Sequence, residues 1–265
     1  MKQTKVLIYA NIIGLAATIV VNALAVLLPL GGKTTQELSD MYPNLFVPAG
    51  ITFSIWGLIY LLLIAFVAFQ AVDFIKNQEV RQIQRIGWLF TASSIANIVW
   101  IFAWQYQNLP ISLVAMIALL TSLILLYLKL DIRRGKVTTK VKYFVHLPIS
   151  IYLGWITVAT VANVTALLVA YHWNRFGLSE VFWTITAILI TLIITSFMII
   201  IRRDYSYSVV IIWALIGIII KRSAFNLLTS SYIVLAASIS VGILFIMIIF
   251  SKLLSESTRV TQKIQ

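Results

Sequence analysis

Aromatic and amide side chains recur at helical spacing in three apolar stretches of the chain. In the first stretch, Phe53, Trp56 and Tyr60 follow one another at intervals of three and four residues, which places them on one face of a helix. Asn97 and Trp100 share a face in the second stretch in the same way. Flat rings can stack on a planar apolar molecule, and an amide can hydrogen-bond to it.

The third stretch carries Trp155 and Ala159 on one face, with Asn163 at its margin. Each pattern alone is also typical of interfacial aromatic belts, of close helix packing through small residues, and of amides that bond across helices. Taken together, the three faces predict a cavity lined by rings and a few amides. Such a cavity suits a large, mostly apolar, planar ligand.

The residue types that catalysis or metal binding would need are missing or scattered. There is no cysteine, and the two histidines, His146 and His172, lie roughly 39 Å apart along a straight helix at ~1.5 Å per residue. They therefore cannot hold one metal or haem together. The carboxylates all fall in loops or at helix ends, which argues against an ion-coupled carrier that uses them. We expect a protein that is not an enzyme, binds no metal and requires no cofactor.

The composition of the chain indicates that most of its side chains are in contact with lipid. Of the 265 residues, 61% are hydrophobic and 11% charged, whereas soluble domains have roughly 45–50% and 25%. A net charge of +12 would suggest nucleic acid in a soluble protein. Here the cations lie in loops, where they set membrane topology, so no nucleic-acid partner is expected.

Apolar runs divide the chain into about eight transmembrane helices, since a spanning helix needs ~20 mostly apolar residues. The run at Tyr207–Ile220 is short, and it either extends past Lys221 and Arg222 or is re-entrant; we expect a full span. The predicted fold is an all-α, polytopic integral membrane protein. The predicted spans are Val6–Leu30, Val47–Val72, Ile86–Trp104, Ile111–Leu130, Phe144–Tyr171, Val181–Ile201, Tyr207–Ile220 and Tyr232–Phe250.

With eight spans, 16 of the 20 lysines and arginines fall on one side of the membrane. This bias predicts that both termini are cytoplasmic, and we expect an integral protein of a bacterial plasma membrane. The longest outer connection, Gly31–Phe46, is either an ordered lid over the outer mouth of the bundle or a plain connector.

Three segments resemble the translocator protein family, also called tryptophan-rich sensory proteins. Val47–Tyr60 is similar to the start of the family's second helix, with a proline followed by W-x-x-x-Y. Asn97–Trp100 is similar to its third-helix N-x-x-W, and Tyr152–Asn163 to its fifth-helix Y-L-x-W-x-x-x-A-T-x-x-N. The three matches come in the family's order.

The resemblance implies a five-helix module at residues 1–175, with a pocket beneath the first long loop that binds porphyrins or sterols. Residues 176–265 would add three transmembrane helices and a short cytoplasmic tail. Where the family's fourth helix carries a tryptophan and an aspartate, this chain has Ile111 and Ala115. Carried over residue by residue, the ligand-binding candidates are Pro48, Phe53, Trp56, Tyr60, Asn97, Trp100, Trp155, Ala159 and Asn163.

The leading hypothesis is a membrane protein that binds a hydrophobic planar molecule, porphyrin-like or sterol-like, in a sensing or transport role. A tetrapyrrole is the candidate ligand, and the expected partners are a hydrophobic small molecule and membrane lipid, with a homodimer left open. One alternative is a small-molecule permease, whose signature would be helices broken near mid-membrane. Another is a scaffold or accessory subunit, which a bundle interior filled by side chains would favour.

Overall fold

The computed structural model of the chain describes residues 2–28, 30–76, 80–135, 137–225 and 227–264. Throughout this described part the secondary structure is helical, with no strand. The elements in chain order are α1 (Lys2–Leu27), α2 (Thr35–Asp40), the 3-10 turn η1 (Gly50–Ser54), α3 (Ile55–Ile75), α4 (Val80–Ile86), α5 (Leu89–Gln105), α6 (Leu109–Lys129), α7 (Thr139–Val141), the π turn η2 (Lys142–His146), α8 (Leu147–Ala170), the 3-10 turn η3 (Arg175–Gly177), α9 (Glu180–Phe197), the π turn η4 (Met198–Arg202), α10 (Tyr205–Ser223) and α11 (Leu228–Ile264).

Seven helices of the described residues are long and apolar enough to cross a membrane, and the 17-residue α5 is a shorter apolar helix among them. Two of the seven run through a π turn, so that 139–170 and 180–202 are each continuous. The chain is therefore an all-α, polytopic integral membrane protein, as its composition predicts.

Most helix boundaries differ from the predicted spans by a few residues, and two of the differences change the interpretation. Helix α10 extends through Lys221 and Arg222 in its last turn, which gives it 19 residues and makes it long and apolar enough to span, as expected. The predicted start of a span at Ile86 is wrong, because Ile86 ends the separate helix α4. Gly87 follows with a φ of +54°, a conformation that glycine adopts without strain, and α5 begins two residues later.

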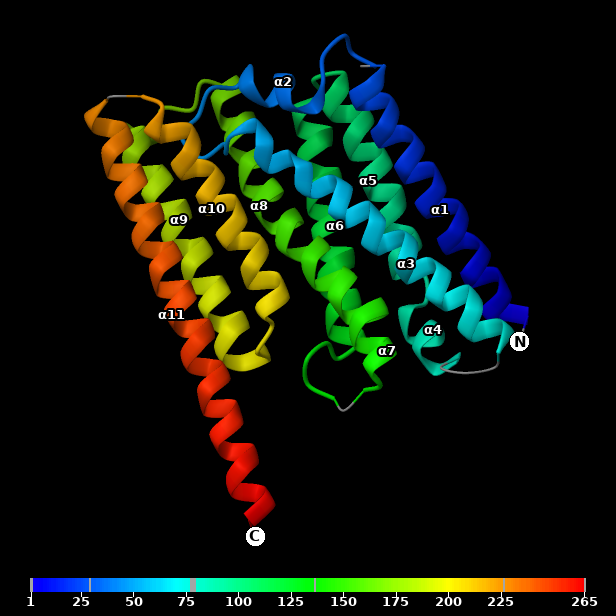
Figure 1. Cartoon of the computed structure of the whole chain (residues 1–265). Helices are drawn as coiled ribbons and strands as arrows, with labels where there is room; N and C mark the ends of the chain where they lie inside the picture. Colours follow the sequence, from blue (N-terminus) through cyan, green and yellow to red (C-terminus); the bar gives the residue numbers. More distant parts are fainter. Residues whose placement is uncertain (1, 29, 77–79, 136, 226, 265) are drawn as a thin grey trace.

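The helices form two groups that meet along α8 (Figure 1). The first group comprises α1, α3, α5, α6 and α8, and the second comprises α9, α10 and α11. Gly154 allows α8 to approach α10 closely, since a Cβ at this position would lie 3.1 Å from the main-chain oxygen of Tyr207 and 3.1 Å from Cβ of Val210. The Tyr207 hydroxyl also donates to Thr157 across the same contact, at 3.1 Å.

A polar ladder holds α1 to its neighbours inside the first group. Asn11 donates to Gln70 of α3 at 2.9 Å and accepts from Thr91 of α5 at 2.8 Å. About three turns further on, Asn22 donates to Asn97 of α5 at 2.7 Å. These amides satisfy one another away from water, as helices in lipid require.

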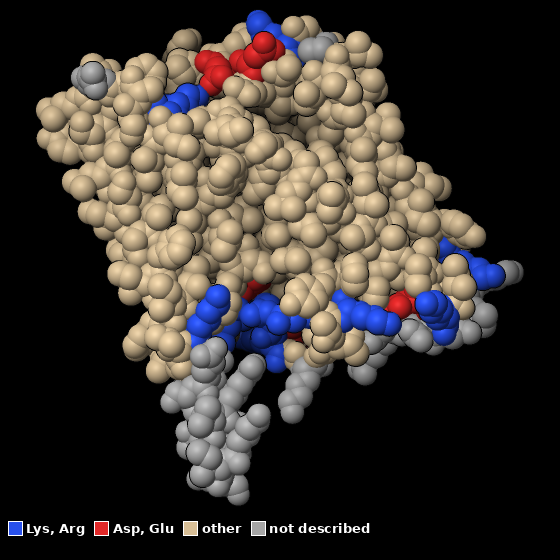
Figure 2. All heavy atoms as spheres, viewed as in Figure 1, with Lys and Arg blue, Asp and Glu red and all other residues tan. Residues whose placement is uncertain are grey.

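Basic side chains gather at the end of the bundle where α1 begins and α11 continues beyond its neighbours (Figures 1 and 2). The start of α1 and the end of α11 thus lie at one end of the bundle, as the prediction of about eight spans implies. The residues after Phe250, predicted as a short tail, continue α11 as helix to Ile264.

One carboxylate at this basic end is fully buried. Asp204 caps α10 through the main-chain N–H groups of Ser206 and Tyr207. It also accepts hydrogen bonds from Tyr127 at 2.9 Å and Ser150 at 2.6 Å. It lies at a helix end, as expected from the sequence, but acts as a joint between α6, α8 and α10.

Candidate ligand-binding site

Aromatic rings from η1, α3, α5 and α8 converge near the end of the first helix group where α2 packs on α5. Trp56 is at the centre: its ring stacks on Tyr60 at a centroid distance of 5.5 Å and on Trp100 at 6.0 Å. Trp155 meets Trp56 edge-on at 6.2 Å and Phe53 at 5.8 Å. The structure thus brings the predicted faces of three helices together in one aromatic cluster.

A void of about 40 Å³ lies within this cluster. Seven of the nine predicted site residues line it: Pro48, Phe53, Trp56, Trp100, Trp155, Ala159 and Asn163. The lining is completed by Thr35 and Ser39 of α2, Trp104 of α5, and Val158 and Ala162 of α8. The rings themselves fill most of the space between these helices.

Several polar atoms at the cluster have no hydrogen-bond partner. The indole N–H groups of Trp100 and Trp155, the Oδ1 of Asn163 and the hydroxyl of Tyr60 are all buried and unpaired. A buried polar group without a partner costs roughly 1–3 kcal/mol. Two indole donors and one amide acceptor therefore remain to be satisfied at the edge of an apolar void.

Tyr60 and Asn97, the two other predicted site residues, lie outside the lining. Tyr60 supports Trp56 from the far side of the stack. Asn97 is fully buried, accepts from Asn22 at 2.7 Å and donates to Tyr152 at 3.1 Å. Asn97 therefore joins α1, α5 and α8, and its contacts in this structure are with helices.

Asn163 has one partner that the sequence did not suggest. Its Nδ2 donates to Ser112 of α6 at 2.9 Å, and both side chains are buried. Ser112 lies in the helix where Ile111 and Ala115 replace the polar residues of the family pattern, so α6 still supplies a polar group here. The two residues are 51 positions apart, and no spacing within a helix could pair them.

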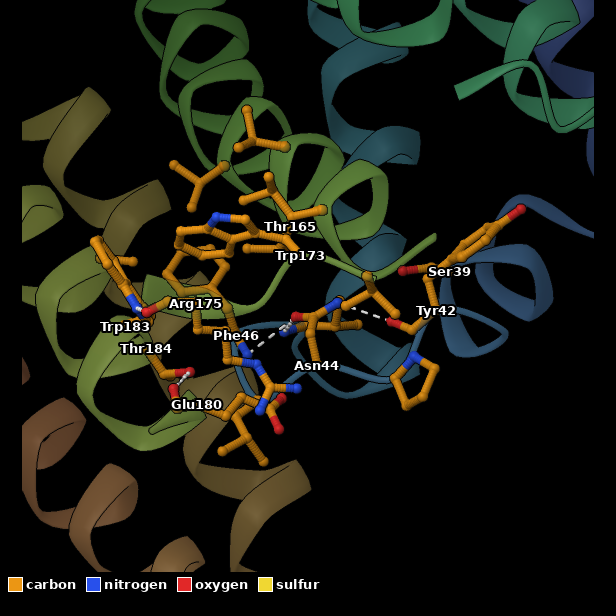
Figure 3. A pocket seen from close by; sticks show the side chains of 18 of the residues that line it. Ser39, Tyr42, Asn44, Phe46, Thr165, Trp173, Arg175, Glu180, Trp183 and Thr184 are labelled. Atoms are coloured by element: carbon orange, nitrogen blue, oxygen red, sulfur yellow. Dashed lines mark hydrogen bonds between the residues drawn. The ribbon is translucent and has the colours of Figure 1, made fainter. Parts of the chain in front are cut away.

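A second, larger cavity of about 1000 Å³ lies between α8, the start of α9 and the end of α10 (Figure 3). The loop before α3 forms one wall, and Ser39 lines both this cavity and the aromatic void. Trp173 and Trp183 lie at its edge, with their ring centroids 5.0 Å apart.

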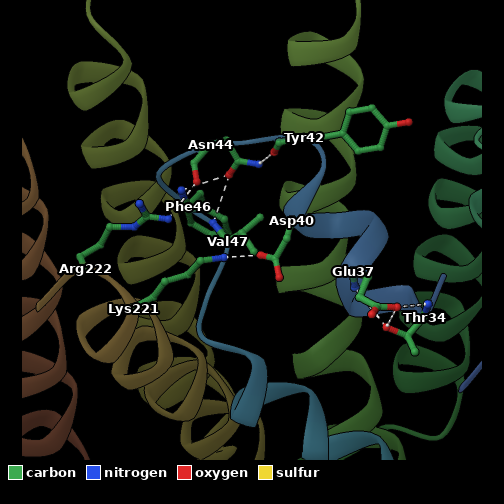
Figure 4. Close-up of polar contacts among 9 residues, drawn as sticks. All are labelled: Thr34, Glu37, Asp40, Tyr42, Asn44, Phe46, Val47, Lys221 and Arg222. Carbon is green, nitrogen blue, oxygen red and sulfur yellow. Dashed lines mark hydrogen bonds and ion pairs between the residues drawn. The ribbon is translucent and has the colours of Figure 1, made fainter. Parts of the chain in front are cut away.

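The loop between α1 and α3 is fastened to α10 through its described residues, from 30 onward (Figure 4). Lys221 forms an ion pair with Asp40 at 2.6 Å, and Arg222 donates to the main-chain oxygen of Asn44 at 3.1 Å. Further along, the main-chain N–H of Ala49 donates to the carbonyl of Gly217 at 2.9 Å. The loop therefore covers the aromatic void and connects the two helix groups.

Helix α2 within this loop was missed by hydropathy because it is short and polar. Its signal is a capping box: Thr34 accepts from the main-chain N–H of Glu37, and the Glu37 carboxylate accepts from the main-chain N–H of Thr34 at 2.7 Å. Hydrogen bonds from the backbone and side chain of Thr34 lower the pKa of Glu37. The T-x-x-E spacing could have located this helix and its void-lining residues.

Comparisons with known proteins extend over both helix groups. A family model described as TSPO-like protein matches residues 7–250. The match begins in α1 and ends in α11, so it includes the three helices that the motifs left outside the resemblance. A search of curated proteins and a search of solved structures each returned no match.

Proposed function

The chain belongs to the TSPO-like protein family, and on this premise we propose that it binds a hydrophobic planar small molecule in the aromatic cluster of α3, α5 and α8. A tetrapyrrole is the leading ligand class, and binding serves the sensing or transport of that molecule. The observation that carries the proposal is the convergence of five rings around a void whose lining includes unpaired indole N–H groups; the rings are those of Phe53, Trp56, Trp100, Trp104 and Trp155.

We propose that the site opens when a flat ligand takes the place of one stacked aromatic ring. A void of about 40 Å³ is far below the 300–1000 Å³ of ordinary ligand pockets, so the ligand has to part the stacked rings. Each aromatic pair contributes roughly 0.5–1.5 kcal/mol beyond burial, and a flat ligand inserted beside Trp56 replaces a ring–ring contact with a ring–ligand contact. The carboxylate oxygens of a tetrapyrrole accept hydrogen bonds, so they are suitable partners for the two unpaired indole N–H groups.

The experiment is a titration of the detergent-purified chain with protoporphyrin, followed by quenching of tryptophan fluorescence. An aliphatic hydrocarbon of similar mass serves as the ligand control. The proposal predicts saturable quenching by protoporphyrin alone. Quenching that rises linearly for both compounds contradicts it.

Two variants locate the binding in the cluster. Ala159→Leu adds bulk to the void without removing a contact, and Trp155→Ala removes a ring and its contact area. Each is expected to weaken binding roughly three- to thirtyfold. Ala118→Leu is the matched control, because it makes the same change at an exposed position on α6. Equal affinities in all three variants contradict the proposed location.

One observation favours the alternative of a scaffold without a ligand: side chains fill the interior of the cluster. A scaffold predicts no saturable quenching by any planar compound. It also predicts that Ala159→Leu lowers stability without any effect on binding, so the same titration separates the two functions.

The distribution of charge indicates how the protein is oriented in the membrane. Because basic side chains crowd the end that carries the start of α1 and the end of α11, we propose that this end is cytoplasmic and that the loop with α2 faces outward. The ligand would then enter from the outer side, beneath the loop.

A further inference from the structure

The larger cavity differs from the aromatic cluster in the chemistry of its walls. Aliphatic side chains form its depth: Val161, Val164 and Leu168 from α8, and Ala187 and Ile190 from α9. With about 1000 Å³ it reaches the upper end of the volumes of ligand sites. Rings also line the cavity, those of Tyr42, Phe46, Trp173, Trp183 and Phe225, but no two of them are stacked on each other. The aliphatic part of the wall suits an acyl chain better than a flat ring system.

A buried cation lies at the outer end of this cavity. Arg222 is 8% exposed, and its guanidinium donates to the main-chain oxygen of Asn44 and lies 5.9 Å from the ring of Phe225. Its Nε has no hydrogen-bond partner. Within the described residues, no carboxylate lies within the 4.0 Å of an ion pair with it.

The neighbouring charges leave this position open for an anion. Lys221, the next residue, already has Asp40 as its partner at 2.6 Å, and that pair is partly exposed. Arg175 also lines the cavity and adds positive charge, whereas the carboxylates of the lining, Glu180 and Asp40, attract Arg222 only from beyond ion-pair distance. A buried charge near the membrane surface is costly unless an opposite charge and hydrogen bonds compensate it.

We infer that this cavity binds an acyl lipid with an anionic head group, a carboxylate or a phosphate. The head group of the lipid accepts hydrogen bonds from Arg222, and its acyl chain lies along the aliphatic wall between α8 and α9. The inference is independent of the proposed function, because its walls, charges and ligand class differ from those of the aromatic cluster. Only the loop residue Ser39 is common to both linings.

Brominated lipids test the site, because bromine on an acyl chain quenches tryptophans that it touches. The full chain is placed in nanodiscs of unbrominated phosphatidylcholine, and brominated phosphatidylglycerol, brominated stearate or brominated phosphatidylcholine is titrated in. Trp173 and Trp183 are the reporters at the edge of the cavity. The anionic lipids should quench saturably and the neutral lipid only in proportion to its amount.

Two variants test the contacts of the lipid head group and those of the acyl chain separately. Arg222→Gln should weaken anionic binding by about tenfold or more, the effect of losing a hydrogen bond to a charged group. Lys33→Gln is the matched control, because it removes one exposed positive charge at the same end of the bundle outside the cavity. Val164→Phe narrows the cavity at its aliphatic wall and leaves the contacts of Arg222 unchanged. It therefore tests the binding of the acyl chain even where Arg222→Gln fails to fold.

The outcomes are distinct. Saturable quenching by both anionic lipids assigns the site to the anionic acyl class, and saturation by stearate alone assigns it to free fatty acids. Equal quenching by anionic and neutral lipids overturns the inference, as does unchanged affinity in a folded Val164→Phe variant. Loss of this binding with protoporphyrin binding intact, or the reverse, shows which of the two sites fails.

Discussion

Replacing Asn97 by leucine distinguishes a structural amide from a ligand contact. The substitution removes the hydrogen bonds to Asn22 and Tyr152 and leaves one amide N–H and one phenol without their partners. Interhelical hydrogen bonds in membranes average about 0.6 kcal/mol each, and an orphaned buried group costs up to about 3 kcal/mol. Asn97→Leu is therefore expected to lower the free energy of unfolding by roughly 1–3 kcal/mol.

Asn163→Leu is the matched variant, since it removes a similarly buried amide from α8, whereas Asn97 belongs to α5. Asn163 has one partner, Ser112, and its Oδ1 is unpaired at the void. This variant should weaken protoporphyrin binding about three- to tenfold and lower stability by less than Asn97→Leu.

The assay measures both quantities on each variant. Unfolding in mixed micelles with increasing dodecyl sulfate gives the stability, and fluorescence quenching gives the affinity. A double-mutant cycle with Asn22→Leu isolates the energy of the amide pair. Normal stability together with lost binding in Asn97→Leu would refute the reasoning and return Asn97 to the ligand site.

Three further perturbations test the joints between the helices. Gly217→Val should prevent α10 from docking on the loop, because any Cβ there collides with Thr52 and Pro48; the expected result is a lower thermal midpoint in detergent. Asp204→Ala should lower the free energy of unfolding by about 3 kcal/mol, from a lost helix cap and lost hydrogen bonds to a charged group, as measured in the same micelle assay. A reporter fused after Gln265 should be active only in the cytoplasm, and activity on the outer side would contradict the proposed orientation.

The fold was predictable from the sequence because lipid imposes a simple rule on it. Apolar length and the position of cations gave the helices and their order, since each spanning segment must satisfy its own backbone. The run at Tyr207–Ile220 was ambiguous only because Lys221 and Arg222 interrupt it. Partners on the loop, Asp40 and the carbonyl of Asn44, allow these cations to remain in the helix.

The site was predictable in part. Spacing identified the faces of α3, α5 and α8, and the structure places seven of the nine residues around one void. It could not assign Asn97, because an amide on a ring-bearing face can turn to a ligand or to a neighbouring helix. Its partner Asn22 lies 75 residues away in a helix without any motif.

The larger cavity could not be predicted from local patterns at all. Its lining comes from five separate segments: the loop with α2, α8, the connection between α8 and α9, α9, and the end of α10. Arg222 was recognised only as an interfacial cation in a short helix. Its burial and its unpaired Nε depend on contacts with a loop almost 180 residues away, at Asn44.

Mapping the bound ligand tests the central claim most directly. A photoactivatable porphyrin, cross-linked to the chain in nanodiscs and located by mass spectrometry, should label peptides of α3, α5 and α8 that contain Trp56, Trp100 and Trp155. Excess protoporphyrin should abolish this labelling, and Ala159→Leu should reduce it. Labelling confined to lipid-facing positions or to the walls of the larger cavity, or labelling that protoporphyrin does not displace, would contradict the account.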